Sequence, residues 1–141
     1  MTDTRELKEL TIHTQADLHR MWQLLMRPLG FSGRSIWLSF VDPDRRPVPS
    51  LVEIAECDDL PSDRETDALF EMLATVLRDA GPEMSVALLV TRPGHLGTND
   101  DDRALGRRLV EGARRAGVPL EPLHVADDAS VRALAPDDLA A

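Results

Sequence analysis

Apolar positions along the first part of the chain follow a helical period. Between Gln15 and Leu29 they recur at i, i+3, i+4, i+7, i+8 and i+11, which is the stripe of an amphipathic helix. Thr14, followed three residues later by Asp17, predicts the N-cap. A Pro-x-Gly sequence at 28–30 predicts the end. The pattern therefore predicts a helix that buries one face.

The period then changes to two, which is typical of half-buried strands. Apolar and polar residues alternate in Ser35–Val41 until an Asp-Pro-Asp turn at 42–44 interrupts them. The alternation returns in Val48–Glu56. Two such runs joined by a short loop predict a β-hairpin across Asp42–Pro47.

Ser62 and Glu65 form a capping-box pattern that predicts the start of a second long helix. Its apolar positions continue to about Asp79, and a Gly-Pro pair at 81–82 ends it. The next run, Ser85–Val90, is short and almost wholly apolar. Such a run is typical of a central strand that is covered on both faces.

A third helix is predicted from about Asn99 to Ala116, with Gly117 in the C′ position. Val118–Ala126 is predicted as a last strand, and its prolines favour a place near a sheet edge. Ser130–Leu139 is predicted to form a final short helix or a loose tail.

The order α-β-β-α-β-α-β predicts a mixed sheet, antiparallel at the hairpin and parallel through the two crossovers. We therefore expect an α/β fold, a three-layer sandwich with helices on both faces of the sheet. The 141 residues suit a single domain, 1–141, with its core at about 12–128 and flexible ends.

Charge and composition narrow the expected partners. Sixteen basic and twenty-five acidic residues give a formal charge of −9, which disfavours nucleic acid and anionic membranes. Cys57 is the only cysteine, so neither an internal disulfide nor a cysteine metal cluster can form. With no apolar leader at the N-terminus, these features predict a cytoplasmic protein, and the preference for arginine over lysine suggests a GC-rich bacterial genome.

The joint between the apolar strand and the third helix carries the densest group of polar residues. Ligands and catalytic groups of α/β proteins collect where strands end and helices begin. Candidates for ligand or partner contact are therefore Arg92, His95, Thr98 and Asn99, with His124 of the last strand. The acidic run 100–102 is interpreted first as carboxylates that complement the helix dipole.

The segment DRALGRRLVEGARRAG at 102–117, followed by VPLEPLHVADD, resembles the C-terminal part of RadC-like members of the JAB/MPN metalloprotease family. The likeness extends over roughly Ile12 to Asp128. It implies a JAB/MPN-like fold with cytidine-deaminase-like layering. It also implies that Asp102 matches the metal-binding aspartate of the family and that Asn99 replaces its serine.

The same resemblance implies that the metal site is incomplete. In TRPGHLG, Arg92 and its neighbours stand in place of the family's histidine-proline-serine, and no two histidines in the chain are separated by one residue. Glu53 is the nearest match to the catalytic glutamate, and His124 matches a histidine that is not a ligand. A catalytic zinc needs three protein ligands and an open position.

The sequence therefore predicts a pseudoenzyme, a protein-interaction or regulatory module without a cofactor, whose partner is a protein and which could form a homodimer. Two alternatives stay open. One is a metal-dependent hydrolase in which His95 and Asp102 hold the metal and Glu53 or His124 completes the site. The other is a small-anion-binding protein that uses Arg92.

Overall fold

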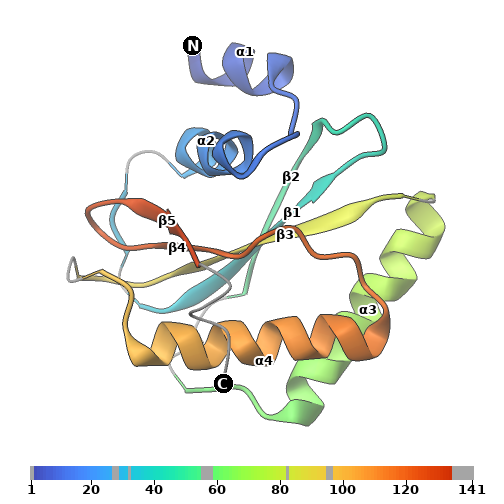
Figure 1. Ribbon diagram of the computed structural model, residues 1–141, viewed down its shortest axis with the longest axis vertical. Coiled ribbons are helices and arrows are strands. Elements are labelled where there is room, and N and C mark those ends of the chain that lie inside the picture. Colours follow the sequence, from blue (N-terminus) through green and yellow to red (C-terminus); the bar gives the residue numbers. More distant parts are fainter. Residues whose placement is uncertain are drawn as a thin grey trace.

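The computed structural model describes residues 2–26, 29–31, 33–54, 59–81, 83–94 and 97–134, which form an α/β fold in three layers (Figure 1). The elements in chain order are α1 (Thr2–Glu9), α2 (Gln15–Leu25), β1 (Ser35–Val41), β2 (Pro47–Ile54), α3 (Asp63–Ala80), β3 (Ser85–Thr91), α4 (Asp100–Ala116), β4 (His124–Ala126) and β5 (Val131–Ala133). Helices α1 and α2 cover one face of the sheet, and α3 and α4 cover the other. The predicted mixed sheet flanked by helices is confirmed.

The sheet has the strand order β2-β1-β3-β4-β5. β1 pairs antiparallel with both β2 and β3, β3 pairs parallel with β4, and β4 pairs antiparallel with β5. All seven residues of β3 are buried, as its continuous apolar run predicts. The central strand therefore has one helical layer on each side of it.

Alternation along the strands divides the core into two clusters. Ile36, Leu88 and Val90 point toward α3 and α4, where Phe70 and Leu109 fill the space. The opposite parity points toward α1 and α2 and packs on a fully buried Trp22. A side chain's position in its strand thus decides which of the two helical layers it can reach.

Three details of the sequence prediction are wrong. Residues 2–9 form α1, which the sequence pattern did not predict because this segment has too few apolar positions to show a helical period. Within Val118–Ala126 only the last three residues form a strand, because the prolines at 119 and 122 restrict the others to an isolated bridge at Leu120. The edge belongs to β5, whose residues 131–133 were predicted as helix or tail.

The ends of other elements also differ from the prediction. Helix α2 ends at Leu25, four residues before the predicted Leu29. The capping boxes at Thr14 and Ser62 form as predicted. In the part of the chain that the structure describes, no helix is long and apolar enough to cross a membrane.

The contact between α3 and α4 depends on Gly112. A Cβ at this position would lie 2.5 Å from Thr66 Cγ2 and 2.8 Å from Phe70 Cδ2. Because both side chains are buried, neither has room to move aside.

We expect Gly112→Ala to destabilise the protein by about 1–3 kcal/mol through overpacking, despite alanine's advantage over glycine in a helix of about 1 kcal/mol. Chemical denaturation would measure the change, with the exposed neighbour changed in Glu111→Ala as control. An alanine variant as stable as the wild type would show that α3 and α4 can separate without cost.

Candidate functional site

The strand–loop–helix joint lies at the carboxyl end of β3, where α4 begins. Asn99 is the N-cap of α4 and forms a capping box with Asp102: the Asn99 side chain accepts from the Asp102 amide at 2.8 Å, and the Asp102 carboxylate accepts from the Asn99 amide at 3.0 Å. This exchange fixes both residues at the first turn of the helix. It satisfies amides that the helix leaves without a partner.

The carboxylate of Asp102 is the centre of a buried ion cluster. Arg92 donates Nε to both carboxylate oxygens at 2.9 and 3.0 Å, and its Nη2 donates to Oδ2 at 2.8 Å. Arg34 Nη2 donates to Oδ1 at 3.3 Å from the segment before β1. Asp102 is 0% exposed and Arg92 7% exposed. Two guanidinium groups therefore compensate one fully buried carboxylate.

The rest of the Arg92 guanidinium is also engaged by the protein. Nη1 donates to the carbonyl of Pro93 at 3.3 Å, and Nη2 donates to the carbonyl of Gly97. Hydrogen bonding to Asp102 raises the pKa of Arg92 above its ordinary value. Arg92 thus links the loop after β3 to the start of α4, and its side chain does not project into solvent.

Two of the predicted site residues lie on the other face of the sheet. Glu53 stands opposite Trp37 in the β1–β2 register and accepts a hydrogen bond from Ser35 Oγ at 2.8 Å. Trp37 packs with the cluster under α1 and α2, which places Glu53 on that side. Asp102 belongs to α4, so the sheet lies between the two carboxylates.

His124 also points away from Asp102. It pairs with Leu89 in the register, on the face that α2 covers, and its ring stacks on His19 of α2 at a centroid distance of 6.1 Å. Nδ1 donates to the carbonyl of Pro122 at 3.0 Å, whereas the buried Nε2 has no hydrogen-bond partner. Burial lowers the pKa of His124 from 6.5 to about 4, because the protonated ring would lose its hydration.

Two aspartates that the sequence analysis did not single out follow β4. The carboxylate of Asp128 accepts hydrogen bonds from the amides of Phe31 and Gly94 at 3.0 and 2.8 Å. These contacts fix the loop after β3 to its neighbours. Asp127 is 0% exposed and forms an ion pair with Arg132 at 3.1 Å, which holds the turn between β4 and β5.

The remaining candidates contribute little to a common site. Thr98 accepts from Arg103 through its carbonyl at 3.5 Å and from Arg132 through its hydroxyl at 3.4 Å. His95 and Cys57 lie outside the described residues. Among the residues that are described, no three His, Cys, Asp or Glu side chains are grouped so that they could hold a metal ion.

No family model, curated protein or solved structure matches this chain. The resemblance to JAB/MPN domains stays a prediction from the sequence. The joint is a charge-compensated helix start. Arg92, Asn99 and Asp102 come together there, while Glu53 and His124 do not join them.

Arg34 is the member of this cluster that sequence reasoning missed. It precedes Ser35 and has the parity of Ile36, which points toward α4. This parity was a usable signal once Ser35–Val41 was predicted as a strand. What the sequence did not supply was the pairing of β1 with β3, which brings Arg34 beside Arg92 although 58 positions separate them.

Proposed function

We propose that this chain is a non-catalytic interaction module, a JAB/MPN-like domain that associates through the edge of its sheet beside β2. The single observation that carries this proposal is an apolar surface at that edge, described below. The ion cluster at the joint supports it, because Arg92 and the Asn99 amide engage the carboxylate of Asp102 at the start of the helix.

The geometry does not favour the alternative of a metal-dependent hydrolase. An ion at Asp102 would have to displace Arg92 from the carboxylate or stand beside two guanidinium groups. Glu53 and His124 cannot reach that ion, because the sheet separates them from it. Among the described residues no three His, Cys, Asp or Glu side chains are grouped to hold a metal, and a catalytic zinc needs three protein ligands.

Large apolar side chains are exposed on and around the β2 edge. The exposed set in the described residues is Leu51, Val52, Leu60, Met72 and Val76, at 37–54% exposure. Three of them, Val52, Met72 and Val76, lie on the α3 side of the sheet, and we call these three the β2–α3 surface. Single exposed apolar residues are ordinary, but a group of them at one edge of a protein marks a contact site.

The helical geometry of α3 explains why these residues form one surface. Asp67 binds Arg115 of α4 at 2.8 Å and thereby marks the α3 flank that faces α4. At 100° per residue, Met72 and Val76 project from the opposite flank. Because α4 borders Leu123 and Leu134 near β4 and β5, that opposite flank of α3 faces the β2 side of the sheet.

Val52 of β2 completes the surface beside them. It pairs with Leu38, whose side chain lies in the cluster under α3 and α4. Val52 therefore points to the same side of the sheet as α3, and it remains 48% exposed. Among the described strands, β2 is an edge strand with a neighbour on one side only.

A second copy of this chain is the occupant that we propose. The chain carries a charge of −9, so two copies repel each other over most of their surface. Glu53 is the only charged residue of β2, and its carboxylate is engaged by Ser35. Contact through the β2–α3 surface therefore removes the exposed apolar side chains of β2 and α3 from water in both copies.

We expect the wild type to sediment as a dimer that dissociates on dilution. Val52→Asp combined with Met72→Asp should weaken the dimer by at least about tenfold, because each copy then places two charges in an apolar contact. Ala129→Asp adds a charge to the exposed turn between β4 and β5, at the opposite edge of the sheet, and should leave the dimer intact. A wild type that stays monomeric at millimolar concentration, or a double variant that dimerises as well as the wild type, would contradict the proposal.

A further inference from the structure

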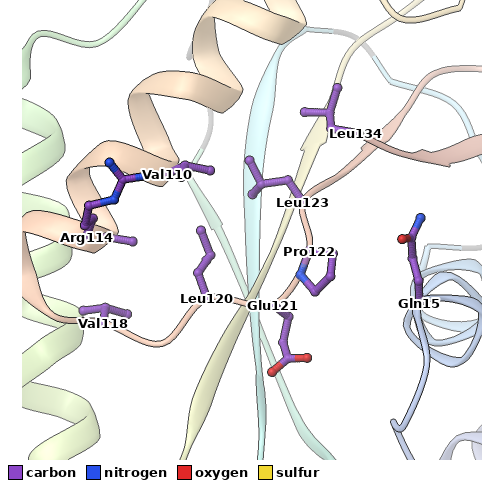
Figure 2. A pocket seen from close by; sticks show the side chains of 10 residues that line it. Gln15, Val110, Arg114, Val118, Leu120, Glu121, Pro122, Leu123 and Leu134 are labelled. Atoms are coloured by element: carbon purple, nitrogen blue, oxygen red, sulfur yellow. The ribbon is translucent and has the colours of Figure 1, made fainter. Parts of the chain in front are cut away.

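A second surface, at the opposite edge of the sheet, has the features of a ligand site. It is a groove of about 440 Å³ between α4, the segment that leads into β4, and the residue after β5 (Figure 2). Its lining is Gln15, Val110, Ala113, Arg114, Val118, Leu120, Glu121, Pro122, Leu123 and Leu134. This volume lies in the range of small-molecule pockets, roughly 300–1,000 Å³.

The floor of the groove is aliphatic because the sheet is wider than the helical layer on this face. Helix α4 packs on α3 along one flank, where Gly112 meets Phe70, and none of the described helices lies beside its other flank. Leu120, Leu123 and Leu134 lie below that free flank (Figure 2). An apolar chain laid here would cover the partly exposed side chains of Val110 and Leu120, and its own hydrocarbon surface would leave water.

The acidic residue of the groove is already neutralised. The carboxylate of Glu121 accepts hydrogen bonds from both terminal nitrogens of Arg45, at 3.0 and 2.7 Å, and from the hydroxyl of Ser85, at 2.6 Å. The hydrogen bonds from Arg45 hold the pKa of Glu121 below its ordinary value. Figure 2 shows its carboxylate pointing away from Leu123. Glu121 therefore contributes no uncompensated negative charge to the groove.

The cation of the groove, in contrast, is available. Arg114 is exposed on the α4 wall beside Val110, and no described residue forms an ion pair or hydrogen bond with its guanidinium. The next residue, Arg115, is paired with Asp67 on the other flank of α4. In a chain with nine excess negative charges, an available guanidinium above an aliphatic floor is the complement of an amphiphilic anion.

We propose that this groove binds a small aliphatic carboxylate. The hydrocarbon chain lies on Leu120, Leu123 and Leu134, and the carboxylate accepts hydrogen bonds from Arg114. This site is independent of the proposed dimer, because it uses the β4–β5 side of the sheet and the dimer uses the β2 side. Either proposal can fail without the other.

The test is a titration of the full chain with decanoate, followed by amide chemical shifts. We expect saturable shifts at Val110, Leu120 and Leu123, and Arg114→Gln should weaken binding by at least about tenfold through the lost charge-assisted hydrogen bonds. Arg64→Gln removes another exposed guanidinium, from α3, and should leave the affinity unchanged. Leu120→Ala should weaken binding by reducing the apolar floor.

Decanol serves as the uncharged probe. If decanol binds as tightly as decanoate, or if Arg114→Gln binds decanoate as tightly as the wild type, the groove does not recognise an anion and the proposal is wrong. Shifts that never saturate, or that appear only on the β2–α3 surface, would overturn it as well.

Discussion

Asp102→Asn is expected to lower the free energy of unfolding by about 3–5 kcal/mol, the cost of leaving a buried charge without its partner. Asparagine has nearly the size of aspartate and keeps an oxygen for the Asn99 amide. It removes the negative charge that Arg92 and Arg34 require, and it replaces one acceptor oxygen with an NH2 group that faces their N–H donors. Chemical denaturation of the two proteins would measure the loss.

Two further variants separate charge compensation from other effects at this helix start. Asp100→Asn removes an exposed carboxylate from the same first turn and is expected to leave the denaturation midpoint almost unchanged. Arg92→Leu combined with Asp102→Leu removes both charges and should recover part of the stability that Asp102→Asn loses. If Asp102→Asn were as stable as Asp100→Asn, the ion cluster would not be what holds the joint.

The second large effect is a loss of stability in mild acid. The pKa of His124 is about 4 in the folded protein and 6.5 without burial. The unfolded chain therefore binds this proton at a higher pH than the folded chain. His124 does not lower the free energy of unfolding above pH 6.5, and it lowers this free energy progressively as the pH falls from 6.5 to 4. The difference corresponds to about 3 kcal/mol.

His124→Leu isolates this contribution from the carboxylates that titrate in the same range, such as Glu121. The variant should show a shallower decline of the free energy of unfolding between pH 6.5 and 4 than the wild type. His13→Leu removes an exposed histidine and should keep the wild-type slope. Equal slopes for wild type and His124→Leu would mean that the buried ring takes up its proton without unfolding the protein.

Most of the architecture could be predicted because it follows from period and capping. The helix from Ser62, the apolar strand from Ser85 and the helix that Gly117 ends all form where their patterns place them. Residues 131–133 could not be recognised as a strand, because three residues are too short to show a period. Their place is set by pairing with His124–Ala126, which is a tertiary contact.

The position of the candidate site could be predicted from the sequence, but the full set of side chains that meet there could not. The sequence places Arg92, Asn99 and Asp102 at one strand–helix joint, and the structure brings these three together. Glu53 and His124 lie on the other face of the sheet. The register of their strands decides this face, and the sequence did not determine the register of the hairpin. Arg34 enters through a pairing between distant segments.

The place that an active site would occupy is thus held by a structural ion cluster, and the two surfaces that we propose for contact with other molecules lie at the two edges of the sheet. At the β2 edge large apolar side chains are exposed. At the β5 edge an arginine stands over an aliphatic groove. This distribution is the basis for proposing association and ligand binding instead of chemistry at the joint.

A crystal structure of the protein soaked in zinc, with anomalous scattering measured at the zinc edge, would show whether Asp102 binds a metal. We expect the carboxylate of Asp102 to stay hydrogen-bonded to Arg92, with no anomalous peak within coordination distance, about 2 Å, of its oxygens. A peak at that distance, with Arg92 displaced from the carboxylate, would contradict this expectation.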